Sequence, residues 1–435
     1  MSPSSETELA TLTKDKQSSA HPHIHPPYSL ARSLFFFTSG IVIMLGYYCM
    51  MAMVKYWISV YGSIFMTVMM FAMNAGGLIG FLMYRYEPSG MKIGTLVIYG
   101  PWVSIAIFTL CFLVGEYMEG QGVLKLMIGS VCAVGLGILN STFHSAFAVV
   151  LFDFGPREIA AHCSGIGFAG ILTTSIAIIQ GITVGTEDQF RLSVHYQIFQ
   201  FITTLIIFVF YYIYAKHPGC DVRLNMLIRP KIDPKDDTNL PSLKSTFKLM
   251  YPLLVTAILN YSTALMVYPP LLFGLGLGLP VSDYMEKQTI LMVHHSFDFI
   301  GKSLYSHITI SDTMANHYMT LSKLFIVFFA SAPFLSSSFE IFKDQAAYTL
   351  TLAILSSFSV GYLSSSLLDA SSRRVSKRHK ANSAFLSILF LFIGLLYGSF
   401  TSLFKRGNFG RYQRSISVRF KWLGTRSQCH LHRSR

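Results

Sequence analysis

The sequence predicts an all-α membrane protein with eleven transmembrane helices. Hydrophobic residues make up 52% of the 435 residues and charged residues only 13%, whereas soluble domains carry roughly 25% charged residues. The hydrophobic residues fall in repeated runs of about 20, the length that spans ~30 Å of hydrocarbon. We therefore expect a polytopic helical protein that resides in the lipid bilayer.

The expected spans follow one another along most of the chain. Hydropathy places them at 33–54, 62–84, 93–115, 124–152, 161–184, 194–215, 247–273, 288–310, 320–341, 346–369 and 382–404. The longest polar connection, a loop at 216–246, separates six spans from five. We therefore expect a 6+5 arrangement, with an N-terminal bundle at 33–215 and a C-terminal bundle at 247–404, as in major-facilitator-like transporters.

The distribution of basic residues predicts the orientation. If the N-terminus is cytoplasmic, most Lys and Arg residues fall on the inside, and the outside loops hold only Lys55, Lys125, Arg191, Lys287 and Lys343. Acidic residues supply most of the outside charge. Because cytoplasmic loops carry an excess of Lys and Arg, we expect the N-terminus and the 216–246 loop to be cytoplasmic.

The two ends of the chain differ in composition from the spans. We expect residues 1–32 to be a disordered cytoplasmic tail, whose alternating histidines at 21–25 belong to a His/Pro tract rather than to a metal site. Residues 405–435 hold nine Lys and Arg residues and no acidic residue, although eleven spans would place them outside. A translocated basic tail, a miscounted last span and a change of reading frame near Lys405 all remain open.

The cysteines do not form a recognisable metal or redox motif. Six are present, four of them inside apolar spans and none in a Cys-x-x-Cys pair, so the sequence predicts neither a disulfide framework nor a zinc site. The net charge of +13 is consistent with the positive-inside pattern of a membrane protein. We expect no cofactor, no metal and no nucleic-acid partner.

The most informative stretch is Val293–Ser303, which places an acid and a base inside an apolar span. Asp298 and Lys302 lie four residues apart and share one face of a helix, with the acid first, the favourable order. A charge at membrane depth costs ~2.5–3.5 kcal/mol on insertion scales, so such residues normally face a polar cavity or a partner. We expect the pair to line a permeation path. The alternative is a structural ion pair that locks two helices together.

Two further features lie in the fourth and fifth spans. Asn140 and His144 are also four residues apart, and with the pair in the eighth span they favour a shared central cavity over separate interhelical hydrogen bonds. The cluster Ser164–Gly170 forms a small-residue surface that lets another helix backbone approach closely. We expect helix packing at its glycines and at one in the tenth span, namely Gly165, Gly167, Gly170 and Gly361.

These motifs, in this order, resemble those of the equilibrative nucleoside transporters. In that family a polar position in the fourth helix precedes a Pro-containing loop, here Pro156, and an SGxGxAG signature, here Ser164–Gly170. The segment Phe297–Ser303 resembles the eighth-helix F-D-x-x-G-R-S motif. Further similarities cover the seventh, tenth and eleventh spans at Val267–Pro270, Phe358–Ser365 and Gly394–Ser399.

The resemblance, which extends over residues 33–404, implies facilitative transport of nucleosides or nucleobases by alternating access, by a monomer in the plasma membrane. It implies that Asp298 accepts hydrogen bonds from ribose hydroxyls and that Lys302 orients this carboxylate. The other substrate contacts that it implies are polar groups at His295, His144 and Asn140, and apolar walls at Tyr268, Leu291 and Met70.

The sequence departs from the family pattern at three positions. The family's Pro-Trp-Asn in the first span is absent, and Gly46 is followed by Tyr47–Val54. His144 stands where the family commonly has Gln, which replaces a neutral amide by a titratable ring. Lys302 replaces the usual Arg. The ammonium group of Lys cannot make the two parallel hydrogen bonds to a carboxylate that the planar guanidinium group of Arg makes.

Other functions remain as alternatives. One is a major-facilitator-type carrier of another small polar metabolite, and the neighbouring histidines also allow proton coupling. A different class is a membrane-embedded enzyme that uses His294, His295 and Asp298. Metal-dependent membrane hydroxylases need several His clusters on one side, and the sequence has one intramembrane His pair, so a transporter is favoured over an enzyme.

Overall fold

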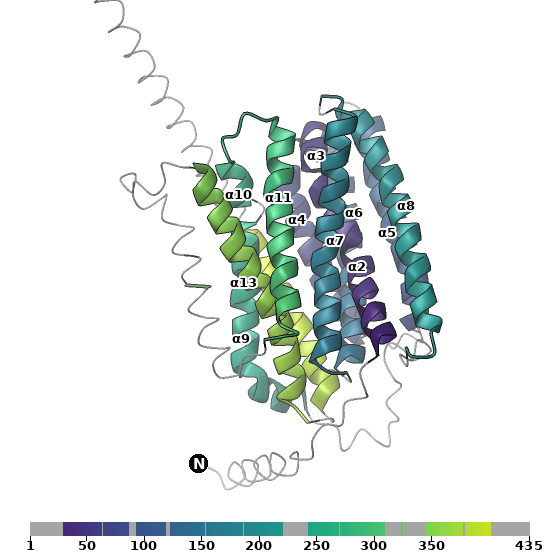
Figure 1. Cartoon of the computed structure of the whole chain (residues 1–435), viewed down its shortest axis with the longest axis vertical. Coiled ribbons are helices and arrows are strands. Elements are labelled where there is room, and N and C mark those ends of the chain that lie inside the picture. Colours follow the sequence, from purple (N-terminus) through teal and green to yellow (C-terminus); the bar gives the residue numbers. More distant parts are fainter. Residues whose placement is uncertain are drawn as a thin grey trace, which may run out of the picture.

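The long apolar runs form helices that stand roughly parallel in one bundle (Figure 1). The computed structural model describes residues 29–62, 64–86, 93–118, 122–152, 154–185, 187–220, 242–268, 270–308, 345–376 and 379–401, together with positions 323, 324 and 327. The expected tails at 1–32 and 405–435, the 216–246 loop and the ninth span at 320–341 lie mostly or wholly outside these residues.

The helices of the first part of the chain are α2 Leu30–Ala52, α3 Val54–Tyr61, α4 Phe65–Tyr86, α5 Ile93–Tyr117, α6 Gly122–Leu151, α7 Pro156–Thr183 and α8 Gln189–Lys216. The second part contains α9 Leu243–Val267, α10 Pro270–Leu275, α11 Asp283–Leu304 and α13 Gln345–Arg373. A further helix, Lys380–Thr401, follows α13 and is called the 380–401 helix below.

Nine helices in the described part of the chain are long and apolar enough to cross a membrane. They correspond to the expected spans other than the eighth and the ninth, so the prediction of a polytopic all-α membrane protein is confirmed. The division into six-helix and five-helix bundles stays a prediction, because the ninth span at 320–341 lies almost entirely outside the described residues.

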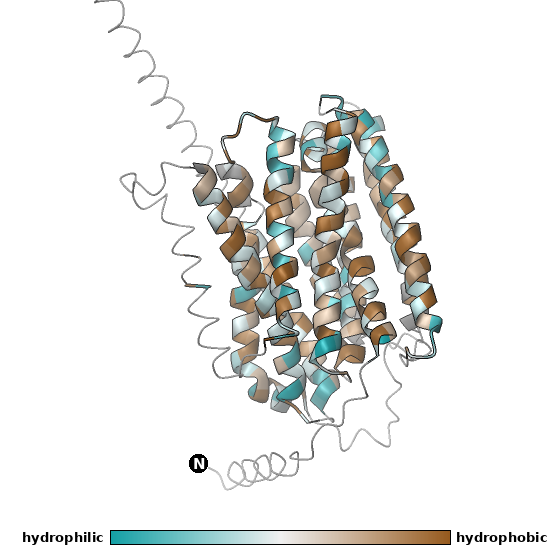
Figure 2. Cartoon of the chain, in the orientation of Figure 1, coloured by the Kyte–Doolittle hydropathy of each residue, from teal (hydrophilic) through white to brown (hydrophobic). Residues whose placement is uncertain are grey.

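The eighth expected span is found as α11, which lies within the bundle but is less apolar than its neighbours. Figure 2 shows hydrophilic bands recurring along this helix. Its first turns carry Asp283, Glu286 and Lys287, and the pair Asp298 and Lys302 follows near its other end. These charges explain why α11 is not among the helices that qualify as spans by composition alone.

One expected span is interrupted within the described residues. The first expected span is found as α2, which ends close to the expected boundary, and the short helix α3 follows it after Met53. The seventh is divided into α9 and α10, and Tyr268 between them has extended backbone angles, φ −109° and ψ 137°. A residue that precedes proline is disfavoured in the helical region, and proline itself provides no N–H. Pro269 and Pro270 therefore end α9 where the chain passes Tyr268.

The four glycines expected to pack helices all lie where two helices approach closely. A Cβ atom at Gly165 of α7 would overlap the carbonyl oxygen of Phe37 on α2. A Cβ atom at Gly170 would overlap the ring of His295, and one at Gly167 would lie 2.8 Å from Cα of Phe299. On the opposite side of α11, a Cβ atom at Gly361 of α13 would overlap the carbonyl oxygen of Asp298. Small residues of this kind allow backbone contact between membrane helices.

The outer face of the bundle is apolar where it would contact lipid. On α8, large hydrophobic side chains are exposed at intervals of three or four residues, at Phe199, Ile202, Ile206, Phe210 and Ile213. In a soluble protein such a stripe would mark an interface. On a membrane helix it is the surface expected to face the acyl chains.

The packing of α7 against α2 predicts the effect of one added methyl group. We expect Gly165→Ala to lower the melting temperature of the purified protein, because overpacking a tight contact costs ~1–3 kcal/mol. The matched control is Gly122→Ala at the start of α6, where a Cβ atom would meet nothing within 4 Å. Equal melting temperatures for the two variants in detergent would contradict the close contact at Gly165.

Candidate functional site

A cavity of about 170 Å³ lies in the interior of the bundle. This is more than ten times the ~10–15 Å³ that one water molecule needs by this kind of measure. Side chains from α2, α4, α6 and α7 line one part of it, and side chains from α9, α11, α13 and the 380–401 helix line the other. The cavity therefore lies between the first six expected spans and the later ones.

The charged group of the cavity is the pair formed by Asp298 and Lys302. Lys302 Nζ donates a hydrogen bond to Asp298 Oδ2 at 2.5 Å. The two residues are only 4% and 6% exposed, respectively. The helix backbone itself sets their spacing, since they lie one turn apart on α11. The glycine contacts at Gly167 and Gly361 bring α7 and α13 close to the backbone around Asp298.

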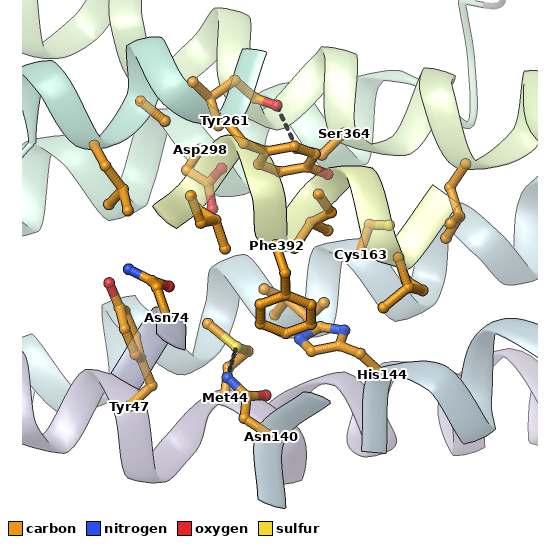
Figure 3. Close-up of a pocket in the computed structure, with 18 of the residues that line it drawn as sticks. Met44, Tyr47, Asn74, Asn140, His144, Cys163, Tyr261, Asp298, Ser364 and Phe392 are labelled. Atoms are coloured by element: carbon orange, nitrogen blue, oxygen red, sulfur yellow. Dashed lines mark hydrogen bonds between the residues drawn. The ribbon is translucent and has the colours of Figure 1, made fainter. Parts of the chain in front are cut away.

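The wall opposite this pair is built by α6 and the 380–401 helix. Figure 3 shows Asn140, His144 and Met44 on one side of the cavity and Asp298 and Tyr261 on the other, with the ring of Phe392 between them. Asn140 Nδ2 makes a weak contact of 3.5 Å with Met44 Sδ, and its buried Oδ1 has no hydrogen-bond partner within the described part of the chain. This wall therefore lines the cavity with an amide and an imidazole group.

A third wall combines rings from α9 and α11. The imidazole of His294 is stacked on the ring of Tyr268 with centroids 3.8 Å apart and planes inclined by 6°. Both side chains line the cavity. His294 Nδ1 also lies 2.5 Å from the hydroxyl of Ser357 on α13. The break after α9 supports this arrangement, because it presents Tyr268 from extended backbone.

Five of the eight expected substrate contacts line this cavity, namely Asn140, His144, Tyr268, Asp298 and Lys302. The other three lie outside its lining. Leu291 is fully buried in an apolar cluster that also includes Val267. Met70 lies one turn before the lining residue Asn74, which donates a hydrogen bond to its carbonyl oxygen at 2.9 Å.

His295 is the third expected contact that the structure places outside the lining. Its ring lies against Tyr48 with centroids 4.6 Å apart, and its Nε2 is 3.4 Å from the hydroxyl of Tyr268. Both tyrosines line the cavity. His295 therefore contacts two lining rings, and its adjacent residue His294 faces the cavity instead.

The structure also adds lining residues that the sequence reasoning missed. They include the neighbouring aromatic residues Tyr47 and Tyr48, the polar residues Asn74, Tyr261, His294 and Ser364, and the thiol of Cys163. A usable signal existed for His294, because positions 294, 298 and 302 form one i, i+4 row of a helix. Tyr47 and Tyr48 stand in the first span where the nucleoside transporter pattern has Pro-Trp-Asn, and they supply aromatic surface there.

The chemistry of the cavity suits the binding of a small molecule. Its lining is mostly apolar and aromatic with a few polar groups, the composition typical of small-molecule sites. Among the described residues no group of three or more His, Cys, Asp or Glu side chains could hold a metal ion. A ligand with a flat apolar part and several hydroxyl or amide groups would match these walls.

Comparisons with known proteins agree with the resemblance seen in the motifs. Residues 221–406 match the model of the nucleoside transporter family. This range includes α9, α11, α13 and the 380–401 helix, and thus Asp298 and Lys302. This match is consistent with the suspected family over less than half of the chain. A comparison with curated protein sequences gave no match.

Solved structures show the same fold at low sequence identity. A proton:xylose symporter of the major facilitator superfamily, XylE bound to 6-bromo-6-deoxy-D-glucose, is 10% identical with a TM-score of 0.53, over 87% of this chain and 89% of that one. A bacterial homologue of the iron transporter ferroportin, in an outward-facing state, is 10% identical with a TM-score of 0.50, over 88% and 99%. The likeness to these structures shows the fold, and the family match over residues 221–406 supports a multi-pass membrane transporter.

The buried ion pair predicts unequal effects of neutralising two lysines of α11. Lys302→Met leaves the Asp298 carboxylate buried without its partner, which should destabilise the protein by ~3–5 kcal/mol. The matched control is Lys287→Met, which removes the exposed pair with Asp283, 2.6 Å apart on the same helix and worth at most ~1 kcal/mol.

The double variant Asp298→Asn/Lys302→Met should recover most of the melting temperature lost by Lys302→Met, because no uncompensated charge remains. Thermal unfolding of the detergent-purified variants measures all three effects. Equal melting temperatures for Lys302→Met and Lys287→Met would contradict the conclusion that the Asp298 carboxylate is buried and needs Lys302 as its partner.

Proposed function

We propose that this multi-pass membrane transporter, whose residues 221–406 match the nucleoside transporter family, carries nucleosides or nucleobases across the membrane by alternating access. The observation that carries the proposal is the buried pair of Asp298 and Lys302, which lies within the matched region and lines a largely apolar cavity. A charge pair at membrane depth is costly and typically marks a substrate path.

A nucleoside fits the chemistry of these walls. It combines a flat apolar base, which has polar edges, with a ribose that has several hydroxyl groups. Asp298 accepts hydrogen bonds from ribose hydroxyls, and Lys302 orients the carboxylate by holding Oδ2. Asn140 and His144 on the opposite wall meet the base or the other edge of the sugar.

Aromatic side chains hold the base in this proposal. Tyr47 and Tyr48 of α2 take the place of the aromatic contact that the family's Pro-Trp-Asn motif supplies. Tyr268 offers a second ring from the break after α9. Leu291, Met70 and His295 act from behind the lining, where they pack against or next to residues that form it.

Alternating access has a structural basis in the contact between α7 and α11. At one end Tyr284 donates a hydrogen bond to the carbonyl oxygen of Ala177 at 2.9 Å, and at the other end Ser303 donates one to Ser164 at 3.0 Å. Between them the glycines of α7 bring the two backbones together. We propose that the helices rock about this glycine contact, so that the hydrogen bonds at the two ends break in alternation.

Transport is facilitative in this proposal. Asp298 is already paired with Lys302, so the site can keep its charges without taking up and releasing a proton in each cycle. The distribution of Lys and Arg supports a cytoplasmic N-terminus, and the family expectation is the plasma membrane. The protein acts as a monomer, with the path through a single bundle.

Uptake of radiolabelled adenosine or inosine tests the proposal in cells that lack nucleoside transport. The wild-type protein should give saturable uptake, and a protonophore should leave it unchanged. Asp298→Asn should reduce uptake at least about tenfold, since hydrogen bonds to a charged group contribute ~1.5–3 kcal/mol. Lys302→Arg should retain uptake, because it keeps the charge that holds Asp298.

Lys287→Met is the control for surface expression and for the general effect of losing a charge from α11. A lack of saturable uptake by wild-type protein that reaches the cell surface would refute nucleoside transport. Saturable uptake that the protonophore abolishes would leave the substrate assignment intact and refute the facilitative mechanism.

The cavity also predicts a thiol-protection effect at Cys163. The other four cysteines within the described residues are buried but do not line the cavity. Methanethiosulfonate ethylammonium should therefore inhibit wild-type uptake, and Cys163→Ser should be resistant. Excess unlabelled adenosine should slow the inhibition, because the bound ligand covers the thiol. Equal inactivation of wild type and Cys163→Ser, or no protection by adenosine, would place the ligand elsewhere.

A further inference from the structure

The imidazole of His294 is held rigidly at the edge of the cavity by two neighbours. One face is stacked on Tyr268 with centroids 3.8 Å apart. Its Nδ1 is hydrogen-bonded to Ser357 Oγ at 2.5 Å. A stacked ring with one nitrogen fixed can neither flip nor tilt freely, so the direction of its second nitrogen, Nε2, is fixed as well.

The hydrogen bonds of Ser357 determine which nitrogen of His294 carries the proton. The Ser357 hydroxyl also lies 2.5 Å from the carbonyl oxygen of Ala353. That carbonyl can only accept, and a hydroxyl has a single proton to donate. Ser357 therefore donates to Ala353 and accepts from His294, which puts the ring proton on Nδ1. In the neutral imidazole Nε2 is then left as an acceptor.

This acceptor is available to a ligand. Among the described residues Nε2 of His294 has no hydrogen-bond partner, although the side chain as a whole is only 9% exposed and lines the cavity. The atom is also not among the fully buried polar atoms without partners, unlike Nδ1 of the adjacent His295. An acceptor on a largely buried side chain that lines the cavity should be satisfied by whatever occupies the cavity.

We propose that His294 binds an N–H donor on the edge of the substrate base and thereby sets base preference. The inference rests on the proposed nucleoside transport and assigns part of its specificity. The Tyr268–His294 stack supplies the surface beside the base, and Nε2 supplies a directional hydrogen bond. Bases that lack the donor leave Nε2 unpaired, which a site of this kind discriminates against.

The effect should be measurable as a ratio of affinities for paired ligands. Each pair differs by one donor: adenosine and purine riboside, guanosine and inosine, uridine and 3-methyluridine. Inhibition constants are measured by competition with uptake of radiolabelled nucleoside. For at least one pair the wild-type protein should prefer the ligand with the donor by about fivefold to tenfold, the usual value of one neutral hydrogen bond.

The variant His294→Phe keeps a ring on Tyr268 but has no acceptor. It should reduce that preference to about one while nucleosides still compete. The Asp298–Lys302 pair is intact in this variant, so uptake should be reduced but still measurable. The comparison of ligands within one variant also cancels differences in expression.

A second pair of variants changes the proton position without changing the ring. Ser357→Ala removes the acceptor of the Nδ1 proton, so the proton can move to Nε2 and the preference should fall. Ser356→Ala is the matched control, because this hydroxyl donates to the same Ala353 carbonyl, at 3.2 Å, and is hydrogen-bonded to no histidine among the residues that the structure describes. It should leave the preference unchanged.

The outcomes separate the inference from the function on which it rests. If wild-type protein shows no saturable uptake of nucleosides, the proposed function and this inference both fail. If uptake is present but no ligand pair shows a preference in the wild type, or the preference survives in both His294→Phe and Ser357→Ala, the inference alone is refuted. Where His294→Phe does not fold, Ser357→Ala decides.

Discussion

The structure has to accommodate two buried charges among apolar helices, the carboxylate of Asp298 and the ammonium group of Lys302. Neither Asp298 nor Lys302 could remain charged at this depth without the other, because desolvation of an isolated ion costs several kcal/mol. Placing both on one helix, one turn apart, makes the pair independent of how neighbouring helices move. A transporter whose two parts rock against each other can therefore keep its internal charge neutral in every state. An interhelical pair would be broken and re-formed in each cycle.

The surroundings of α11 follow from the same requirement. Gly167 and Gly361 allow two helices to lie against its backbone at the level of the carboxylate, and water is excluded from those sides. The remaining side opens onto the cavity. The carboxylate is thus accessible from one direction, which is where a polar ligand enters. On the same wall, Tyr268 and Ser357 hold the imidazole of His294 in one orientation. In the proposed nucleoside complex, α9, α11 and α13 would therefore contact both the sugar and the base.

Hydropathy predicted the membrane spans and helical spacing placed Asp298 and Lys302 on one face, because both signals depend only on local sequence. The break within the seventh span was missed, although Pro269 and Pro270 mark its position in the sequence. The rotation of α11 about its own axis cannot be predicted from local sequence, because packing against the neighbouring helices sets it. A rotation of about 100° separates adjacent helical residues, and His294 lines the cavity where the sequence predicted His295. Leu291 and Met70 lie outside the lining for a related reason: span alignment predicts the depth of a residue in the membrane, whereas helix packing sets the direction of its side chain.

The two sides of the cavity differ in how they are built. Around Asp298 the contacts are backbone against backbone, through glycines where a single added carbon would collide with a neighbouring helix. The opposite wall at Asn140, His144 and Phe392 is made of side-chain ends, which can change in length or polarity without moving a helix. One wall is therefore mechanically rigid and tolerates little variation, and the other is adaptable. Related proteins can acquire new ligands by substitution on the adaptable wall while the buried ion pair stays where it is, so the range of ligands can evolve without rebuilding the helix contacts.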